Sequence, residues 1–155
     1  MSRARVRAWG ELREEMVSSP ARAVGTLYRR FLAAANDQYE ARGWKGVTMS
    51  HVQFLSETDQ AGTRLSDVAS ALGTTKQYVG KLAKDLESKR LVTLVADPLD
   101  GRAVLARPTE RGRAFLQDAC EIRAALEASY LGRLTASRAA AFVTALEELV
   151  APQES

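Results

Sequence analysis

LSDVASALGTTKQYVGKLAKDL, residues 65–86, contains two short helical patterns separated by a turn. Ser66 is placed to cap the first helix, and Gly73 ends it. Thr74 and Gln77 form a Ser/Thr-x-x-Gln capping box that opens the second helix. The apolar residues recur at helical spacing and are Leu65, Val68, Ala69 and Leu72 in the first helix and Val79, Leu82, Ala83 and Leu86 in the second.

The outward face of the second helix is polar and basic. Its residues are Thr75, Lys76, Gln77, Gly80, Lys81 and Lys84. A helix–turn–helix motif presents such a face to the DNA major groove, where Gln pairs with adenine, Lys reaches guanine or phosphate, and the Thr methyl meets thymine. The alternative interpretation of the same residues is the solvated face of an ordinary surface helix.

A predicted β-hairpin follows the second helix. Residues 91–95 are rich in β-forming residues, residues 97–101 are typical of a turn, and residues 103–106 resemble a returning strand. Arg102 lies just beyond the tip. A hairpin after a recognition helix is a wing, and an arginine at its tip can enter the narrow minor groove.

Two sequence motifs in and after the hairpin resemble those of a known family. DPLDGR (97–102), followed by TERG (109–112), resembles the wing signature D-P-x-D-x-R…L-T-x-x-G of the MarR family of bacterial winged-helix regulators. LESKRLV (86–92) is similar to the end of that family's recognition helix. The chain departs from the family at Pro108, which replaces the usual Leu. Leu94 and Gly101 stand where arginine is common, so the wing is expected to grip phosphates more weakly.

The resemblance implies a set of DNA-binding residues in the helix–turn–helix and the wing. They are Thr74, Thr75, Lys76, Gln77, Lys81, Lys84 and Arg102. Asp100 is expected to orient Arg102 or to stabilise the turn rather than to touch DNA. The alternative for Asp100 and Arg102 is an exposed hairpin ion pair that contributes little to stability.

The charge distribution supports a polyanionic partner. The net charge of the 155 residues is only +3, but residues 74–113 hold nine Lys and Arg against five Asp and Glu, an excess of four. A basic surface is therefore local to the motif region, as expected of a nucleic-acid-binding protein. A solvated basic face would show the same excess, so the charge supports the motif without replacing it.

The remaining sequence predicts helices. A charged helix is expected over residues 3–17, and Ser19 with Pro20 opens a long amphipathic helix that Gly43 closes. Thr48 or Ser50 caps a short helix, and residues 61–63 form a turn into the motif region. After the wing, Thr109 caps a long helix and Thr135 starts the last one.

The sequence therefore predicts a mainly α fold, with one β-hairpin wing on a winged helix-turn-helix lobe and dimerisation helices at both ends. A single MarR-like domain is expected over residues 1–155, with the winged-helix lobe at 48–113 and dimerisation helices at 1–47 and 114–155. The apolar stripes of the terminal helices exceed what one lobe needs to cover. The alternative is that these helices close the core of a monomer.

The family resemblance also implies a small effector, often an aromatic or anionic one, held between the dimerisation helices and the DNA-binding lobe. Tyr39, Trp44 and His51 lie where the first long helix meets the next and are candidate ligand-binding residues. Each residue type is also common in cores and on surfaces. Such a ligand would shift the separation of the two recognition helices.

The resulting functional hypothesis is a dimeric, sequence-specific DNA-binding regulator, a repressor relieved by a small ligand, that binds a pseudo-palindromic operator. A winged-helix protein-interaction module without specific DNA binding is the alternative. No metal, cofactor or catalytic arrangement is indicated, because the chain has one histidine and one cysteine, so an enzyme is not expected. Cys120 is expected to be a small buried residue. No signal segment or membrane-spanning run is evident, and a cytoplasmic protein is expected.

Overall fold

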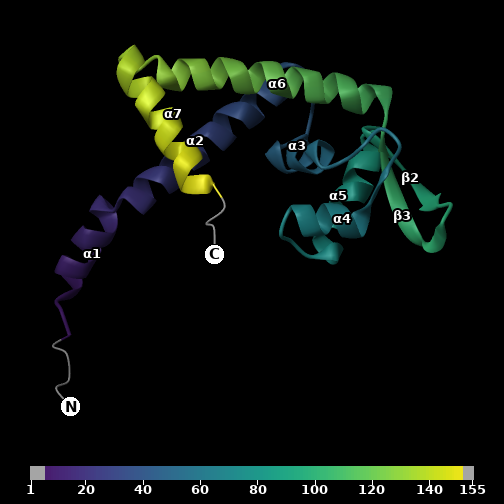
Figure 1. The fold of residues 1–155 in the computed structure, drawn as a ribbon, viewed down its shortest axis with the longest axis horizontal. Helices are drawn as coiled ribbons and strands as arrows, with labels where there is room; N and C mark the ends of the chain where they lie inside the picture. The colour runs from purple at the N-terminus through teal and green to yellow at the C-terminus, as the bar shows by residue number, and fades with distance from the viewer. Residues whose placement is uncertain (1–5, 152–155) are drawn as a thin grey trace. The chain divides into compact units, whose positions relative to one another are not determined.

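The computed structural model describes residues 6–151, which form two compact units, one up to Ala34 and one from Ala35 onward. The fold is mainly α with a small antiparallel sheet, as predicted (Figure 1). The elements, in chain order, are α1 (Trp9–Ser18), α2 (Pro20–Ala41), α3 (Met49–Ser56), β1 (Thr63–Arg64), α4 (Leu65–Ala71), α5 (Lys76–Ser88), β2 (Val92–Asp97), β3 (Asp100–Pro108), α6 (Glu110–Leu131) and α7 (Ala136–Val150).

The first unit consists of α1 and the first part of α2. Pro20 is the first residue of α2, as expected of a residue that lacks a backbone N–H and has its φ preset for a helix. The helix predicted over residues 3–17 begins only at Trp9, and residues 3–5 lie outside the described part of the chain. No α1 residue is buried, and the Trp9 side chain is 81% exposed.

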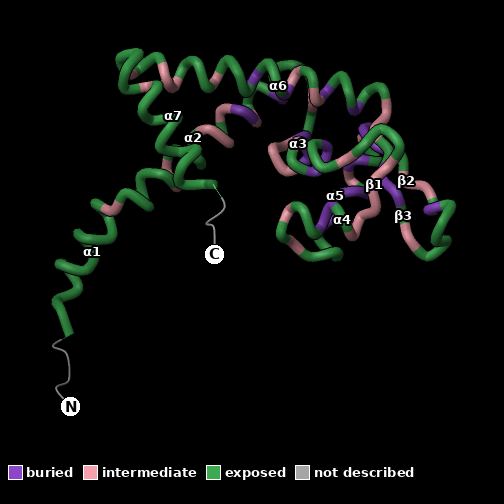
Figure 2. The backbone as a smooth tube through the Cα atoms, viewed as in Figure 1, coloured by how far each residue is buried: buried purple, intermediate pink, exposed green. Residues whose placement is uncertain are grey.

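The second unit has one hydrophobic core. The core is formed where the end of α2 meets α3, α4, α5, the sheet and the first half of α6, and its buried residues lie in the purple segments of Figure 2. Its largest fully buried side chains are Tyr39, Phe54, Phe115, Leu86 and Leu91. By contrast, α7 has no buried residue.

The sheet contains one more strand than the sequence predicts. Its order is β1-β3-β2, with both pairs antiparallel. The two-residue strand β1 pairs Thr63 with Ala106 and Arg64 with Leu105, where the sequence indicated only a turn. Two residues are too few to show the alternation typical of a strand. The strand can therefore be identified only from its pairing with β3.

Two local expectations in this unit are wrong. Ser66 does not cap α4, because Arg64 is the N-cap residue and no side-chain cap bond forms there. Cys120 is exposed rather than buried. The core-facing residues of α6 include Phe115, Ala119 and Ile122, and at about 100° per residue Cys120 points well away from them.

Candidate nucleic-acid interface

The turn between α4 and α5 is built by Gly73 and Thr75. Gly73 has a left-handed φ of +59°, and the Thr74 N–H donates to the Ala69 carbonyl at 3.0 Å, which closes α4 with a Schellman motif. The Thr75 hydroxyl accepts a hydrogen bond from the Tyr78 N–H at 3.2 Å and caps α5. The predicted Thr74–Gln77 capping box is therefore wrong by one residue, because the tight turn uses Thr74 to close the preceding helix.

The α5 helix separates its buried and exposed faces as its sequence predicts. Val79, Leu82, Ala83 and Leu86 are buried. Of the predicted DNA-binding residues on this segment, Thr75, Lys76, Gln77, Lys81 and Lys84 are exposed and Thr74 is partly exposed. The core thus fixes the helix so that one polar, basic face meets solvent.

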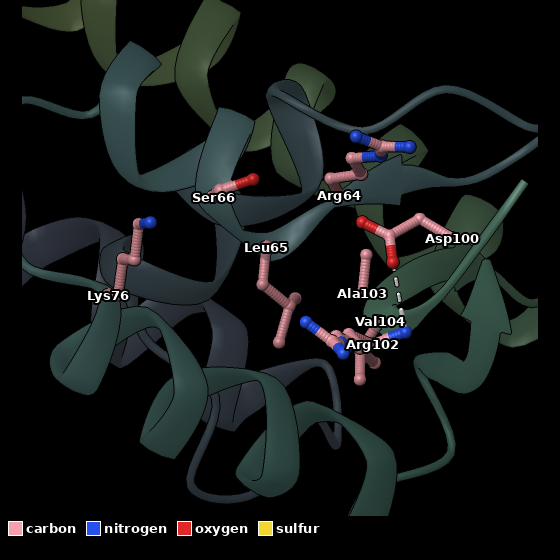
Figure 3. A pocket seen from close by; sticks show the side chains of 8 residues that line it. All are labelled: Arg64, Leu65, Ser66, Lys76, Asp100, Arg102, Ala103 and Val104. Carbon is pink, nitrogen blue, oxygen red and sulfur yellow. Dashed lines mark hydrogen bonds between the residues drawn. The ribbon is translucent and has the colours of Figure 1, made fainter.

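A surface hollow of about 360 Å³ joins the start of α5 to the wing. Lys76 of α5 and Arg102 of β3 both line it, together with Arg64, Leu65, Ser66, Asp100, Ala103 and Val104 (Figure 3). The structure therefore brings two of the predicted DNA-binding residues to one surface, although 26 positions separate them in sequence. Lys81 and Lys84 lie further along the exposed face of α5.

Asp100 stabilises the wing turn. Its carboxylate accepts a hydrogen bond from the Arg102 N–H at 3.1 Å, which is the turn role expected from the sequence. Among the ion pairs of the described residues, none joins the Asp100 and Arg102 side chains. The Arg102 guanidinium therefore remains available for an external anion.

A nearly buried carboxylate anchors the wing to the start of α4. Asp97, 6% exposed at the end of β2, accepts a hydrogen bond from the Leu99 N–H at 2.8 Å. Its other oxygen lies 2.6 Å from both Nε and a terminal nitrogen of Arg64. These contacts lower the pKa of Asp97, first through the Leu99 hydrogen bond and then through Arg64.

Acidification is expected to loosen this anchor. Because the folded-state pKa of Asp97 lies below its unfolded value of about 4, its contribution to stability is present above that value and is lost as pH falls through the folded pKa. The NMR resonance of the Leu99 amide should move in that pH range and report the change. An Asp97→Asn variant should lack this acid-dependent step, while Asp67→Asn on α4 should keep it. An unchanged profile in Asp97→Asn would show that another group anchors the wing.

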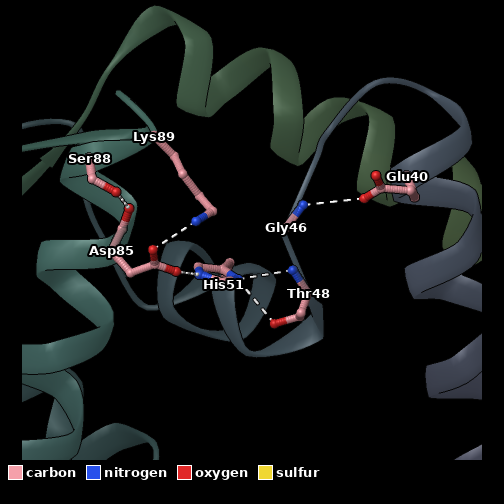
Figure 4. Close-up of polar contacts among 7 residues, drawn as sticks. All are labelled: Glu40, Gly46, Thr48, His51, Asp85, Ser88 and Lys89. Carbon is pink, nitrogen blue, oxygen red and sulfur yellow. Dashed lines mark hydrogen bonds and ion pairs between the residues drawn. The ribbon is translucent and has the colours of Figure 1, made fainter.

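His51 connects α3 to α5. Its Nδ1 accepts a hydrogen bond from the Thr48 N–H at 2.9 Å, so Nε2 carries the proton and donates to Asp85 at 2.7 Å (Figure 4). Lys89 donates to the other Asp85 oxygen at 2.7 Å. These bonds lower the pKa of Asp85, with the Lys89 hydrogen bond as the largest cause. His51 therefore helps to hold α5 in place.

The other two predicted ligand residues pack around Phe115 of α6. The Tyr39 and Trp44 rings meet the Phe115 ring edge-on, with centroids 5.4 and 5.2 Å away. The Trp44 Nε1–H donates to Asp118 at 2.6 Å. Burial raises the pKa of the Tyr39 hydroxyl. The structure thus brings Tyr39 and Trp44 together, whereas His51 faces α5.

Two residues of this surface were missed by sequence reasoning. Tyr78, 45% exposed in the first turn of α5, follows Gln77 directly, and its hydroxyl can donate to a phosphate. An exposed aromatic residue next to a predicted recognition residue is the signal that could have revealed it. Arg64 had no comparable signal, because its partner Asp97 is 33 residues away in sequence.

The described residues show neither a metal centre nor a membrane span. Within residues 6–151, no group of three or more His, Cys, Asp or Glu side chains is arranged to hold a metal ion. In the same range, no helix combines the length and apolar character that crossing a membrane requires.

The chain is similar to a sequence family and to solved structures. The sequence model of the MarR family matches residues 45–103. No curated protein sequence matches the chain significantly. Among solved structures, BpsR of Bordetella bronchiseptica has a TM-score of 0.70 at 22% identity, covering 88% of this chain and 96% of that one. That structure concerns the regulation of BpsR DNA binding by 6-hydroxynicotinic acid.

Two further solved structures share the fold. Wild-type MarR from E. coli in its apo form has a TM-score of 0.72 at 17% identity, with 85% of this chain and 96% of that chain covered. The MepR–DNA complex of S. aureus has a TM-score of 0.71 at 19% identity, with the same coverage of 85% and 96%. The family match over residues 45–103 confirms the resemblance to the MarR family in the segment from α3 to the wing, and the solved structures share the fold.

Proposed function

We propose that the protein is a transcriptional regulator that binds double-stranded DNA through α5 and the wing. The observation that carries this proposal is the hollow shared by Lys76 and Arg102, which presents cations from the recognition helix and the wing on one surface. A helix in the major groove and an arginine in the adjacent minor groove need such an arrangement. The family match supports the same function.

The proposed active form is a homodimer. Apolar side chains remain exposed along α7, where Leu149 is 81% exposed, and along α1, where Met16 is 70% exposed. Exposed apolar side chains on helices at both ends of the chain are suited to pack against the same helices of a second copy. A two-fold dimer would read a pseudo-palindromic operator with half-sites about 34 Å apart.

We further propose that the dimer acts as a repressor relieved by a small aromatic or anionic ligand. Solved structures with the same fold include BpsR, whose DNA binding is regulated by 6-hydroxynicotinic acid, and CouR from Rhodococcus jostii bound to p-coumaroyl-CoA. Tyr39, Trp44 and His51 remain the proposed ligand-binding residues. Because these side chains already have partners in the core, a ligand there would compete with the contacts of Phe115 or Asp85.

The roles of the wing and the recognition helix are expected to separate by mutation. Arg102→Ala should weaken binding to all duplexes, most strongly where an A·T tract narrows the minor groove, and should reduce the salt slope by about 0.9. Gln77→Ala should relax discrimination at particular base pairs by about 1–3 kcal/mol. Fluorescence anisotropy with a duplex from beside the protein's own gene, and with base-pair variants of it, measures both effects.

The same assay tests the function itself. Specific binding at one dimer per site, with a linear dependence of log affinity on log salt, is the expected result. Equal, sequence-blind losses from Arg102→Ala and Gln77→Ala would contradict the proposed roles. Binding no tighter than to random DNA at every salt concentration would favour the protein-interaction module instead.

A further inference from the structure

Arg90 occupies a backbone position that favours glycine. Its φ is +59°, and it is the only non-glycine residue with a positive φ among residues 6–151. It follows the end of α5, where the Leu91 N–H donates to the Leu86 carbonyl at 2.9 Å and closes the helix with a Schellman motif. Glycine adopts this conformation without the steric cost that a side chain incurs. The arginine side chain is therefore a candidate for a role that offsets the cost.

Arg90 shares a surface hollow with two other cationic residues. Ser88, Lys89, Arg90 and Arg111 line a surface hollow of about 340 Å³ at the end of α5. Within the described residues, the Arg90 guanidinium has no hydrogen bond or ion pair, whereas Lys89 is paired with Asp85 at 2.7 Å. The hollow thus has two cations, Arg90 and Arg111, that no carboxylate of the described residues neutralises.

The Arg111 guanidinium is held in a defined orientation. Its Cζ lies 4.9 Å from the centre of the Trp44 ring, and its Nε donates to the Lys89 carbonyl at 3.3 Å. Its terminal nitrogens have no partner among the described residues. A planar guanidinium with a fixed Nε and free terminal N–H groups is preorganised to bind an oxyanion.

The hollow is separated from the proposed DNA surface by the length of the recognition helix. Ser88 is the last residue of α5 and Lys76 is the first, so about 18 Å of helix lies between them at 1.5 Å per residue. The first turns of a recognition helix enter the groove, and its far end points away. These cations therefore do not belong to the contact made by Lys76 and Gln77.

We infer that this hollow is a binding site for a small multivalent oxyanion of the phosphate class, held by Arg90 and Arg111. Arg90 supplies the unpaired charge, and Arg111 supplies the oriented fork of donors. The hydroxyl of Ser88 lines the same hollow. The site does not depend on whether the protein binds DNA.

Inorganic pyrophosphate is a suitable probe for this site. In ¹H–¹⁵N NMR spectra of the full-length protein at constant ionic strength, pyrophosphate should cause saturable shifts of the Arg90, Leu91 and Arg111 amides. Sodium chloride at matched ionic strength should not. Shifts that follow ionic strength alone would overturn the proposal. Shifts with a random DNA duplex but not with pyrophosphate would also overturn it, in favour of a DNA backbone contact.

An Arg90→Gly variant separates binding from folding. It removes the guanidinium, so pyrophosphate affinity should fall about tenfold or more. It also removes the steric cost of a side chain at a positive φ, so the melting temperature should not fall. Arg111→Gln should also weaken binding. The matched control is Arg113→Gln, because Arg113 is exposed on α6 and points about 200° away from Arg111. Wild-type affinity in Arg90→Gly, or an equal loss in Arg113→Gln, would contradict the site.

Discussion

Replacing Gly112 with alanine is expected to lower the free energy of unfolding by about 3 kcal/mol or more. Gly112 lies in the first turn of α6, and a Cβ atom built there would overlap the backbone carbonyl of Leu91. Backbone cannot move aside as the end of a flexible side chain can. The overlap would therefore separate α6 from the junction between α5 and β2.

Several hydrogen bonds depend on the same close approach. The Thr109 hydroxyl donates to the Arg90 carbonyl at 2.7 Å, lies 3.1 Å from the Leu91 carbonyl, and accepts from the Gly112 N–H at 2.9 Å. The Thr109 N–H also donates to the Leu91 carbonyl at 3.0 Å. Because Leu91 is fully buried, displacing its backbone would disturb the core as well.

Gly80→Ala is the matched control for this stability prediction. Gly80 is also helical, but a Cβ atom there would meet nothing within 4 Å. This variant should gain about 0.5–1 kcal/mol, because alanine is a better helix former than glycine. Urea unfolding followed by circular dichroism measures both variants. Equal changes in Gly112→Ala and Gly80→Ala would show that α6 does not need this close approach.

Placing two carboxylates on the apolar face of α7 is expected to convert the proposed dimer into a monomer. Leu146 and Leu149 lie on the side of α7 that also carries Phe142, and Leu149 is 81% exposed in the single chain. Aspartate at both positions would bury charge in an interface between copies, which is strongly unfavourable. In an isolated chain these exposed positions would tolerate it.

The loss of dimerisation should lower the affinity for a two-half-site operator by about 100-fold or more, because each subunit would then bind alone. Light scattering after gel filtration gives the mass, and anisotropy gives the affinity. Thr144→Asp adds one carboxylate on the opposite side of α7. It should leave both the mass and the operator affinity unchanged. A Leu146→Asp/Leu149→Asp protein that remains dimeric would place the interface elsewhere.

Local patterns determined the helices and the wing. The buried face of α5 was predicted residue by residue, because helical periodicity of 3.6 residues directly encodes which side chains share a face. The cap of α6 by Thr109 and the hairpin around residues 97–101 were also predicted correctly. Such features depend on residues within one or two turns of each other. Their patterns can therefore be recognised in the sequence.

The exact boundary between two helices joined by a turn of one or two residues was harder to predict. Both Thr74 and Thr75 can cap a helix, and the sequence pattern indicated Thr74, whereas Thr75 forms the cap. The choice depends on how tightly Gly73 closes the preceding helix. Cys120 was placed in the core for a similar reason, since apolar neighbours at mixed spacing do not define the exact direction of the core.

Contacts between distant segments were decided only by the tertiary structure. The pairing of β1 with β3 and the anchoring of Asp97 by Arg64 join residues more than 30 positions apart. The bond between His51 and Asp85 likewise spans 34 positions. Amino-acid sequence alone determined the winged-helix elements and the basic face of α5, because these follow from local periodicity and turn chemistry. The hollow shared by Lys76 and Arg102 exists only because packing brings α5 and the wing together.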